Sequence, residues 1–120
     1  MRNLLQRNLE KAMALVAQGR FAEAHPLVVD LARKAPKHPL VWSLLGVIAS
    51  SGDDHGKAAR YFKKACALAP REEDFHNNLG EAYRKSERFE DALICFETAL
   101  SIAPNHAAAR NNIGATLNAL

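Results

Sequence analysis

The chain repeats itself every 34 residues. The matching residues fall into six sets, which are Gly46, Gly80 and Gly114; Pro36, Pro70 and Pro104; Leu45, Leu79 and Ile113; Ala58 and Ala92; Phe62 and Phe96; and Ala65 and Ala99. A fixed period of this length is the signature of stacked helical units, because one such unit cannot bury its apolar face without a neighbour. The 120 residues therefore predict one domain built as a row of similar units.

Each unit is predicted to contain two helices. After Pro39, apolar residues recur at helical spacing until Ser51-Gly52-Asp53, which is expected to end the first helix. A second apolar stripe begins at Ala58, and Pro70 closes the unit because proline cannot continue the hydrogen-bond ladder of a helix. Alternating β-branched residues are absent, so no strand is expected.

The small residues of a unit predict where its two helices cross. Gly46 and Ala58 have little or no side chain, so two backbones can approach closely there, and Phe62 is expected to fill the gap beside them. A glycine inside a helix costs about 0.8–1 kcal/mol relative to alanine. The return of glycine at the same register in later units therefore indicates a packing requirement.

These residues together resemble the tetratricopeptide repeat. Trp42, Leu45 and Gly46 match its W-x-x-L-G pattern, a tyrosine follows the glycine of the next unit at Tyr83, and the spaced Ala, Phe, Ala and Pro complete the match. The departures are Ala49, where the family usually has tyrosine, and His76, where it usually has tryptophan.

The resemblance implies an all-α fold, a right-handed superhelical solenoid of antiparallel helix pairs with about three repeats and a terminal helix. Residues 1–120 would form a single domain. Its expected parts are an atypical first repeat at 5–38, a second repeat at 39–72, a third repeat at 73–106, and a final helix at 107–120 that is a partial fourth repeat or a cap.

The first repeat departs most from the pattern. Ala12 replaces the glycine, while Val28 and Leu31 replace the phenylalanine and the alanine. Terminal repeats are often atypical because one side has no neighbour. Pro26 lies within the expected second helix and predicts either a kink or a late helix start. The final helix would expose alanine, isoleucine and leucine, which favours a piece of a longer protein over a dedicated cap.

The resemblance also implies a concave groove, lined by the first helix of each pair, that holds an extended peptide or a helix of a partner protein. The expected contact residues are Leu9, Met13, Ser43, Val47, Asn77, Asn78, Glu81, Arg84, Asn111 and Asn112, with Val16, Ser50 and Lys85 in the same register. The first two units offer apolar side chains, and the last two offer amides and charges. The alternative for Leu9, Met13 and Val16 is simple packing beneath the first unit.

Two Asn-Asn pairs occur at the same register: Asn77-Asn78 precedes Leu79-Gly80, and Asn111-Asn112 precedes Ile113-Gly114. An amide both donates and accepts, so it can hold a peptide backbone without reading side chains. The pairs resemble the asparagine ladder in repeats of O-GlcNAc transferase and of bacterial proteins that fuse such repeats to transferase domains. That likeness would make Asn78 and Asn112 two rungs, while Leu44 keeps the ladder short. The alternative is an exposed polar helix face.

Catalytic and cofactor chemistry is not indicated. Two cysteines are too few for a disulfide scaffold, the five histidines make no His-x-x-x-His pair, and no glycine-rich phosphate loop occurs. We therefore expect no metal, no cofactor and no enzyme activity in this chain alone. A net charge of +3 without a basic block, and aromatic residues at core positions, argue against nucleic-acid binding. No signal or membrane-spanning segment is recognisable, which predicts a cytoplasmic protein without membrane insertion.

The favoured interpretation is a protein–protein interaction scaffold. The alternatives are an N-terminal substrate-recruiting or regulatory module of a larger transferase, and a small dedicated chaperone of the secretion type. Binding of a chaperone tail is disfavoured, because the lysine and asparagine with which co-chaperone members of the family clamp a terminal carboxylate are absent. The unpaired helix at 107–120 could also support self-association.

Overall fold

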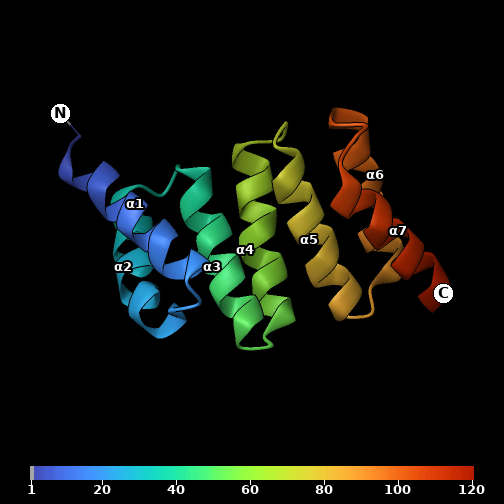
Figure 1. Cartoon of the computed structure of the whole chain (residues 1–120), viewed down its shortest axis with the longest axis horizontal. Coiled ribbons are helices and arrows are strands. Elements are labelled where there is room, and N and C mark those ends of the chain that lie inside the picture. Colours follow the sequence, from blue (N-terminus) through green and yellow to red (C-terminus); the bar gives the residue numbers. More distant parts are fainter. Residues whose placement is uncertain (1) are drawn as a thin grey trace.

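The computed structural model describes residues 2–120, and these fold into seven helices without a strand (Figure 1). The helices are α1 (Leu4–Ala17), α2 (Phe21–Lys34), α3 (Pro39–Ser51), α4 (His55–Leu68), α5 (Glu73–Lys85), α6 (Phe89–Ile102) and α7 (Ala107–Ala119). The molecule measures 46 × 27 × 22 Å, and each helix packs mainly on its neighbours in the chain. The expected all-α helical-repeat solenoid is confirmed.

The turn inside each helix pair has the same geometry. Gly19, Asp53 and Glu87, which are 34 residues apart, all have a positive φ, between 61° and 74°. This left-handed residue lets the chain leave the first helix and reverse direction. The residue after it then donates its backbone N–H to a carbonyl five residues earlier, as from Asp54 to Ala49 at 3.0 Å. The reversal makes the two helices of a pair antiparallel.

The expected crossing of glycine and phenylalanine is confirmed. A Cβ atom on Gly80 would lie 2.6 Å from the ring of Phe96, and Gly46 is crowded in the same way by Phe62. Real Cβ atoms essentially never approach another atom that closely, so neither position accepts a side chain unless the ring moves. Gly114 has no atom within 4 Å of such a Cβ, because no helix follows α7 in residues 2–120.

The first pair solves the same packing problem with different residues. Ala12 and Val28 occupy the registers of glycine and phenylalanine, and both are completely buried. Leu31, in the register of Ala65, is also buried. A smaller side chain at the phenylalanine register leaves room for the methyl group of Ala12, and Leu31 supplies the volume that valine lacks.

Pro26 does not delay its helix. α2 begins at Phe21, five residues before Pro26, and continues through it to Lys34, so the predicted late start is wrong. Proline removes only its own N–H from the ladder, which leaves the carbonyl of Ala22 without its helical donor. Ala22 and Pro26 both face solvent, where water can bond that carbonyl. The alternative prediction, a kink at Pro26, stays a prediction.

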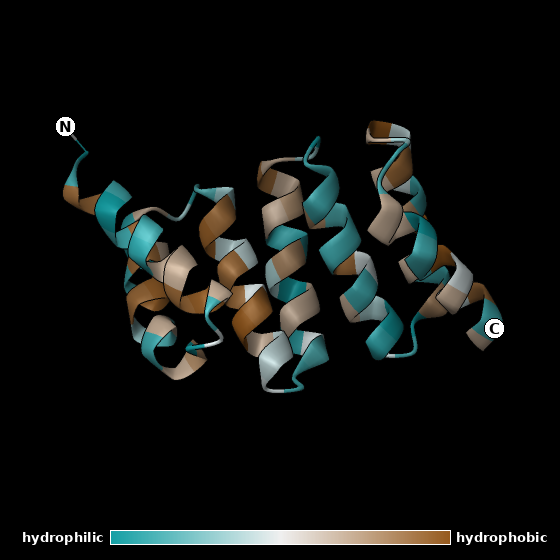
Figure 2. Cartoon of the chain, viewed as in Figure 1, coloured by the Kyte–Doolittle hydropathy of each residue, from teal (hydrophilic) through white to brown (hydrophobic). Residues whose placement is uncertain are grey.

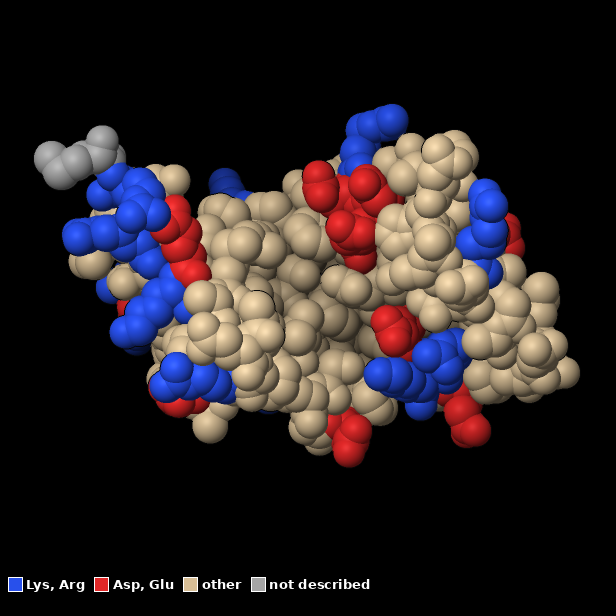
Figure 3. All heavy atoms as spheres, in the orientation of Figure 1, with Lys and Arg blue, Asp and Glu red and all other residues tan. Residues whose placement is uncertain are grey.

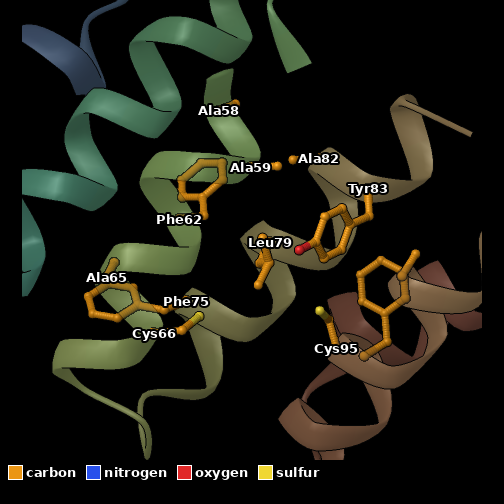
Figure 4. Packing of buried hydrophobic residues seen from close by; sticks show 12 residues of the cluster. Ala58, Ala59, Phe62, Ala65, Cys66, Phe75, Leu79, Ala82, Tyr83 and Cys95 are labelled. Atoms are coloured by element: carbon orange, nitrogen blue, oxygen red, sulfur yellow. The ribbon is translucent and has the colours of Figure 1, made fainter. Parts of the chain in front are cut away.

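Two apolar clusters form the core. One joins α1, α2 and α3, and the other joins α4, α5 and α6, with partly buried Trp42 packed against both. Figure 4 shows the second cluster, in which Leu79 and Tyr83 of α5 meet side chains of α4 and α6. Cys66 and Cys95 are both buried there as free thiols.

A recurring hydrogen bond ties the first helices α3, α5 and α7 to the proline of the preceding turn. The indole N–H of Trp42 donates to the carbonyl of Pro36 at 2.8 Å. His76 Nε2 lies 2.8 Å from the carbonyl of Pro70, which requires the Nε2–H tautomer, and Arg110 donates to Pro104 at 2.7 Å. Histidine at position 76 therefore preserves the donor that tryptophan supplies one repeat earlier.

Candidate binding groove

A hollow of about 170 Å³ separates α3 from α5 near the middle of the molecule. By contrast, α1 packs on α3 and α5 packs on α7. The hollow is lined by Val47 and Ser50 of α3, Phe62 of α4, and Asn78, Glu81, Ala82 and Lys85 of α5. Three expected contact residues, Val47, Asn78 and Glu81, thus come together with two more from the same register.

The two sides of this hollow differ in polarity. Figure 2 shows α3 largely apolar and α5 largely polar. On the face shown in Figure 3, an uncharged tract lies in the middle of the molecule, between mostly basic side chains with some acidic ones at the N-terminal end and mixed charges further along. The change from apolar to polar side chains therefore falls at the hollow itself.

Two adjacent asparagines of α5 have different surroundings. Asn77 is only 7% exposed, and its Oδ1 accepts a hydrogen bond of 3.0 Å from Nδ2 of Asn112 on α7. Asn78 is half-buried and lines the hollow, and no side-chain hydrogen bond within residues 2–120 uses its amide. One residue along a helix is a rotation of about 100°, so neighbours of the same type face different partners. Asn77 joins α5 to α7, and Asn78 remains available to a ligand.

Ser43 is also less accessible than the expected groove requires. It is 5% exposed, in the same register as Asn77, so neither side chain reaches the open surface. Asn111 holds that register on α7 and is exposed, since no later helix covers it in residues 2–120. The accessible part of the expected contact set therefore excludes Ser43 and Asn77.

The apolar residues of α1 divide between the two interpretations. Leu9 and Val16 pack against the first apolar cluster, as expected if their role is packing beneath the first unit. Met13 is 42% exposed and remains available for contact. Of these three residues, Met13 is therefore the one whose side chain stays exposed.

The charged residues at the C-terminal end of α5 are only loosely paired with one another. Glu81 lies 3.9 Å from both Arg84 Nη2 and Lys85 Nζ, which is too long for a hydrogen bond. Arg84 Nε is buried and has no hydrogen-bond partner within residues 2–120. Neither contact of Glu81 therefore fixes the guanidinium of Arg84 by a close ion pair.

Phe62 and Ala82 were not expected in the hollow. Sequence reasoning assigned Phe62 to the gap between paired helices, and the same ring also reaches the space between α3 and α5. The sequence could have predicted this for Phe62, because a phenylalanine that packs on Gly46 of a first helix also lies near the space beside that helix.

The two cysteine thiols have low reactivity. Burial raises the pKa of the Cys66 thiol to about 11 and that of Cys95 to about 12, so both stay protonated near neutral pH. Among residues 2–120, no three His, Cys, Asp or Glu side chains gather where they could hold a metal ion. None of the helices in this described part is long and apolar enough to cross a membrane.

Sequence models of the tetratricopeptide repeat match residues 9–73 and 73–106. The chain belongs to the tetratricopeptide repeat family. Its resemblance to the family at the level of individual residues therefore extends over most of its length, including the atypical first repeat.

Single proteins that resemble this chain match it over only part of its length or at low sequence identity. Anaphase-promoting complex subunit 6 of Arabidopsis thaliana is 37% identical over 73 residues, which cover 57% of this chain and 13% of that protein. The chain spans only 12–13% of the length of the curated relatives that it matches first.

Solved structures agree in fold. The first repeat domain of Spaghetti (RPAP3), bound to an HSP90 peptide, superposes with a TM-score of 0.90 at 20% identity and covers 96% of this chain and 91% of that one. The O-GlcNAc transferase of Thermobaculum terrenum superposes with a TM-score of 0.90 at 23% identity and covers 98% and 23%. At these identities the likeness shows the fold alone.

Proposed function

We propose that this protein-interaction scaffold binds an extended segment of a partner protein in the groove between α3 and α5. The observation that carries the proposal is the hollow in which apolar Val47 of α3 faces the unbonded amide of Asn78 on α5. Membership of the tetratricopeptide repeat family supports it, as does the Spaghetti domain of the same fold that holds an HSP90 peptide.

The chemistry of the hollow suits a peptide backbone. Val47 and Phe62 give an apolar base that gains free energy when a partner side chain displaces water from it. The amide of Asn78 can donate to a backbone carbonyl and accept from a backbone N–H, independent of the partner's sequence. Lys85 lines the same hollow and adds a charged donor for carbonyl or carboxylate oxygens.

The groove also has a direction. Exposed Met13 offers an apolar contact on α1, whereas exposed Asn111 offers an amide on α7. The partner segment that fits would carry an apolar side chain at the end over α1 and a polar, extended stretch over α5 and α7. In this proposal the groove recruits a protein and performs no catalytic step.

A second candidate is a recruiting module inside a larger transferase. The observation that favours it is the match to protein O-mannosyl-transferase TMTC1 of Mus musculus, which is 29% identical over 115 residues and covers 91% of this chain but 12% of that protein. Under this alternative the same groove would present substrates to catalytic residues elsewhere in a longer protein.

The test is retention of proteins from a native extract by the wild-type chain and by matched variants. Asn78→Ala and Val47→Glu change the hollow and leave the bond between Asn77 and Asn112 intact. Asn105→Ala is the control, because Asn105 is exposed in the turn before α7. We expect the wild type and the control to retain the same protein and both groove variants to lose it.

Equal retention by all four proteins, with unchanged helical circular dichroism, would place binding outside the groove and refute the proposal. If the retained protein is a substrate modified by a transferase that contains this chain, the second candidate is favoured. Asn112→Ala is unsuitable as a first variant, because it would also break the junction between α5 and α7.

A further inference from the structure

The second helices carry a larger hollow that the groove does not use. It has a volume of about 500 Å³ and lies between α2 and α4. It is lined by Val29 and Arg33 of α2, Trp42 and Leu45 of α3, and Tyr61 and Lys64 of α4. Val29 is 43% exposed, so an apolar wall of this hollow faces solvent.

Trp42 is held in a fixed position within this hollow. Its indole N–H is bonded to the carbonyl of Pro36 at 2.8 Å. Its ring stacks on Tyr61 with centroids 6.1 Å apart, and Lys64 Nζ lies 3.9 Å from the centroid of the indole. Rigid aromatic walls lose little conformational entropy when an apolar side chain packs on them, which favours binding.

Stacking of repeats does not require such a hollow. The four positions 34 residues after Val29, Trp42, Tyr61 and Lys64 are Lys63, His76, Cys95 and Thr98. The next junction therefore has neither the paired aromatic rings nor the aliphatic wall. The composition of the hollow between α2 and α4 is particular to that junction.

The surroundings of the hollow are basic. α4 carries Lys57, Arg60, Lys63 and Lys64 and no carboxylate, and none of these four cations forms an ion pair within residues 2–120. On α2, Arg33 and Lys34 share one acid, Asp30, at 2.8 and 3.0 Å. An occupant that matches this surface must present carboxylates around an apolar side chain.

The same chain has a helix with that chemistry. α6 carries Glu90, Asp91 and Glu97 and no lysine or arginine. Ile94 is 64% exposed, and Glu90 and Glu97 lie four residues before it and three after it, on the same face of the helix. An isolated large apolar side chain flanked by acids is the complement of an apolar hollow flanked by bases.

We propose that two copies of this chain pair back to back, with α6 of each copy docked on α4 of the other. Ile94 enters the hollow between α2 and α4, and Glu90 and Glu97 face the cations of α4. A two-fold axis makes the two contacts equivalent and doubles the buried area. Stable interfaces bury about 1,200–2,000 Å² in total, so a second, equivalent contact favours a stable pair. The pairing leaves the groove between α3 and α5 open and does not depend on the proposed function.

The first test is sedimentation equilibrium of the wild type, Ile94→Asn and Leu117→Asn. Leu117 on α7 is a matched control, since it is 55% exposed and also tests self-association through 107–120. We expect the wild type and Leu117→Asn to dimerise, less strongly as salt rises. Ile94→Asn should weaken the pair by about 10-fold or more, because an isoleucine side chain is no longer buried. Trp42, the one tryptophan of the sequence, reports the pairing by its fluorescence.

A strictly monomeric wild type at high concentration would overturn the proposal. So would a dimer that Leu117→Asn disrupts and Ile94→Asn leaves intact, which would assign the contact to α7. Because all substituted positions are exposed, loss of folding is excluded for each variant by its circular dichroism.

The second test exchanges the charges. Lys57→Glu, Arg60→Glu, Lys63→Glu and Lys64→Glu together make α4 acidic, and Glu90→Lys with Glu97→Lys makes α6 basic. Each of these two variants alone faces like charges across both contacts, so we expect monomers. In a mixture, both contacts of the mixed pair join opposite charges, and we expect dimers to return. A mixture that stays monomeric while the wild type dimerises would show that the pairing uses other surfaces.

Discussion

The first helix pair and the third pair pack the same crossing with different residues. In α5 and α6, Gly80 leaves space for the ring of Phe96. In α1 and α2, Ala12 stands opposite a register filled by Val28, and both are completely buried. The difference teaches that the repeat conserves the combined volume at the crossing, so that glycine is required only where phenylalanine is present.

The largest expected effect is on the tight crossing. Gly80→Ala should lower the free energy of unfolding by about 1–3 kcal/mol, because its Cβ would overlap the ring of Phe96. In a Phe96→Val background, which imitates the first pair, the same change should instead stabilise, since the methyl group fills vacated space. Chemical denaturation of the four proteins measures both values. If Gly80→Ala has the same sign in both backgrounds, the volume argument fails.

The next prediction removes an oddity of the first pair. Pro26→Ala should stabilise the chain by about 1–3 kcal/mol, because it restores a helical hydrogen bond to the carbonyl of Ala22 inside α2. Thermal and denaturant unfolding measure the change. Pro39→Ala is the control, because proline in the first turn of α3 replaces no helical hydrogen bond and should show little gain. An unchanged stability for Pro26→Ala would mean that α2 already compensates for the missing bond.

The substitution Gly114→Ala should have a smaller effect on the free energy of unfolding than Gly80→Ala, and of opposite sign. Nothing lies within 4 Å of a Cβ added there, so Gly114→Ala should stabilise α7 by about 0.8–1 kcal/mol through helix propensity alone. The measurement is the midpoint of denaturation beside that of Gly80→Ala. Destabilisation by Gly114→Ala would reveal a neighbour packed against this face of α7.

The last prediction concerns pH and acts on only one of the two apolar clusters. Both thiols lie in the cluster of α4, α5 and α6, and burial raises their pKa values from 9.0 to about 11 for Cys66 and about 12 for Cys95. The unfolded chain therefore releases these protons first, so stability is full below pH 9.0 and falls as pH rises toward 11 and 12. Melting temperatures across this range should decline less for Cys66→Ala with Cys95→Ala. If the melting temperatures of the wild type and the double variant fall equally with pH, the two thiols are not the groups that cause the decline.

The periodicity of the sequence predicted the helices and the crossings, because glycine, phenylalanine and proline each constrain the backbone wherever they recur. It left open whether α2 passes through Pro26 with a kink or begins late, since tolerance there depends on the exposure of Ala22. It also could not separate Asn77 from Asn78. Their roles follow from the position of Asn112 on another helix, which a pattern within one repeat does not contain.

The sequence pattern also could not tell which of the expected groove residues are accessible. Register alone selected Ser43 and Met13 equally, and the structure buries the first and exposes the second. Burial depends on how closely neighbouring repeats approach, and that distance differs along the stack. The hollow lies between α3 and α5, which make few close backbone contacts, whereas α1 packs on α3 and α5 packs on α7.

The most direct test of the groove is photo-cross-linking in a native extract, with a benzophenone amino acid placed either at Ser50 in the hollow or at Ala67 on the exposed side of α4. The account predicts that Ser50 yields an adduct with a partner protein that an excess of unlabelled chain suppresses, and that Ala67 yields at most an adduct with a second copy of this chain. An adduct with the partner from Ala67 and none from Ser50 would contradict the groove and move recognition to the outer helices.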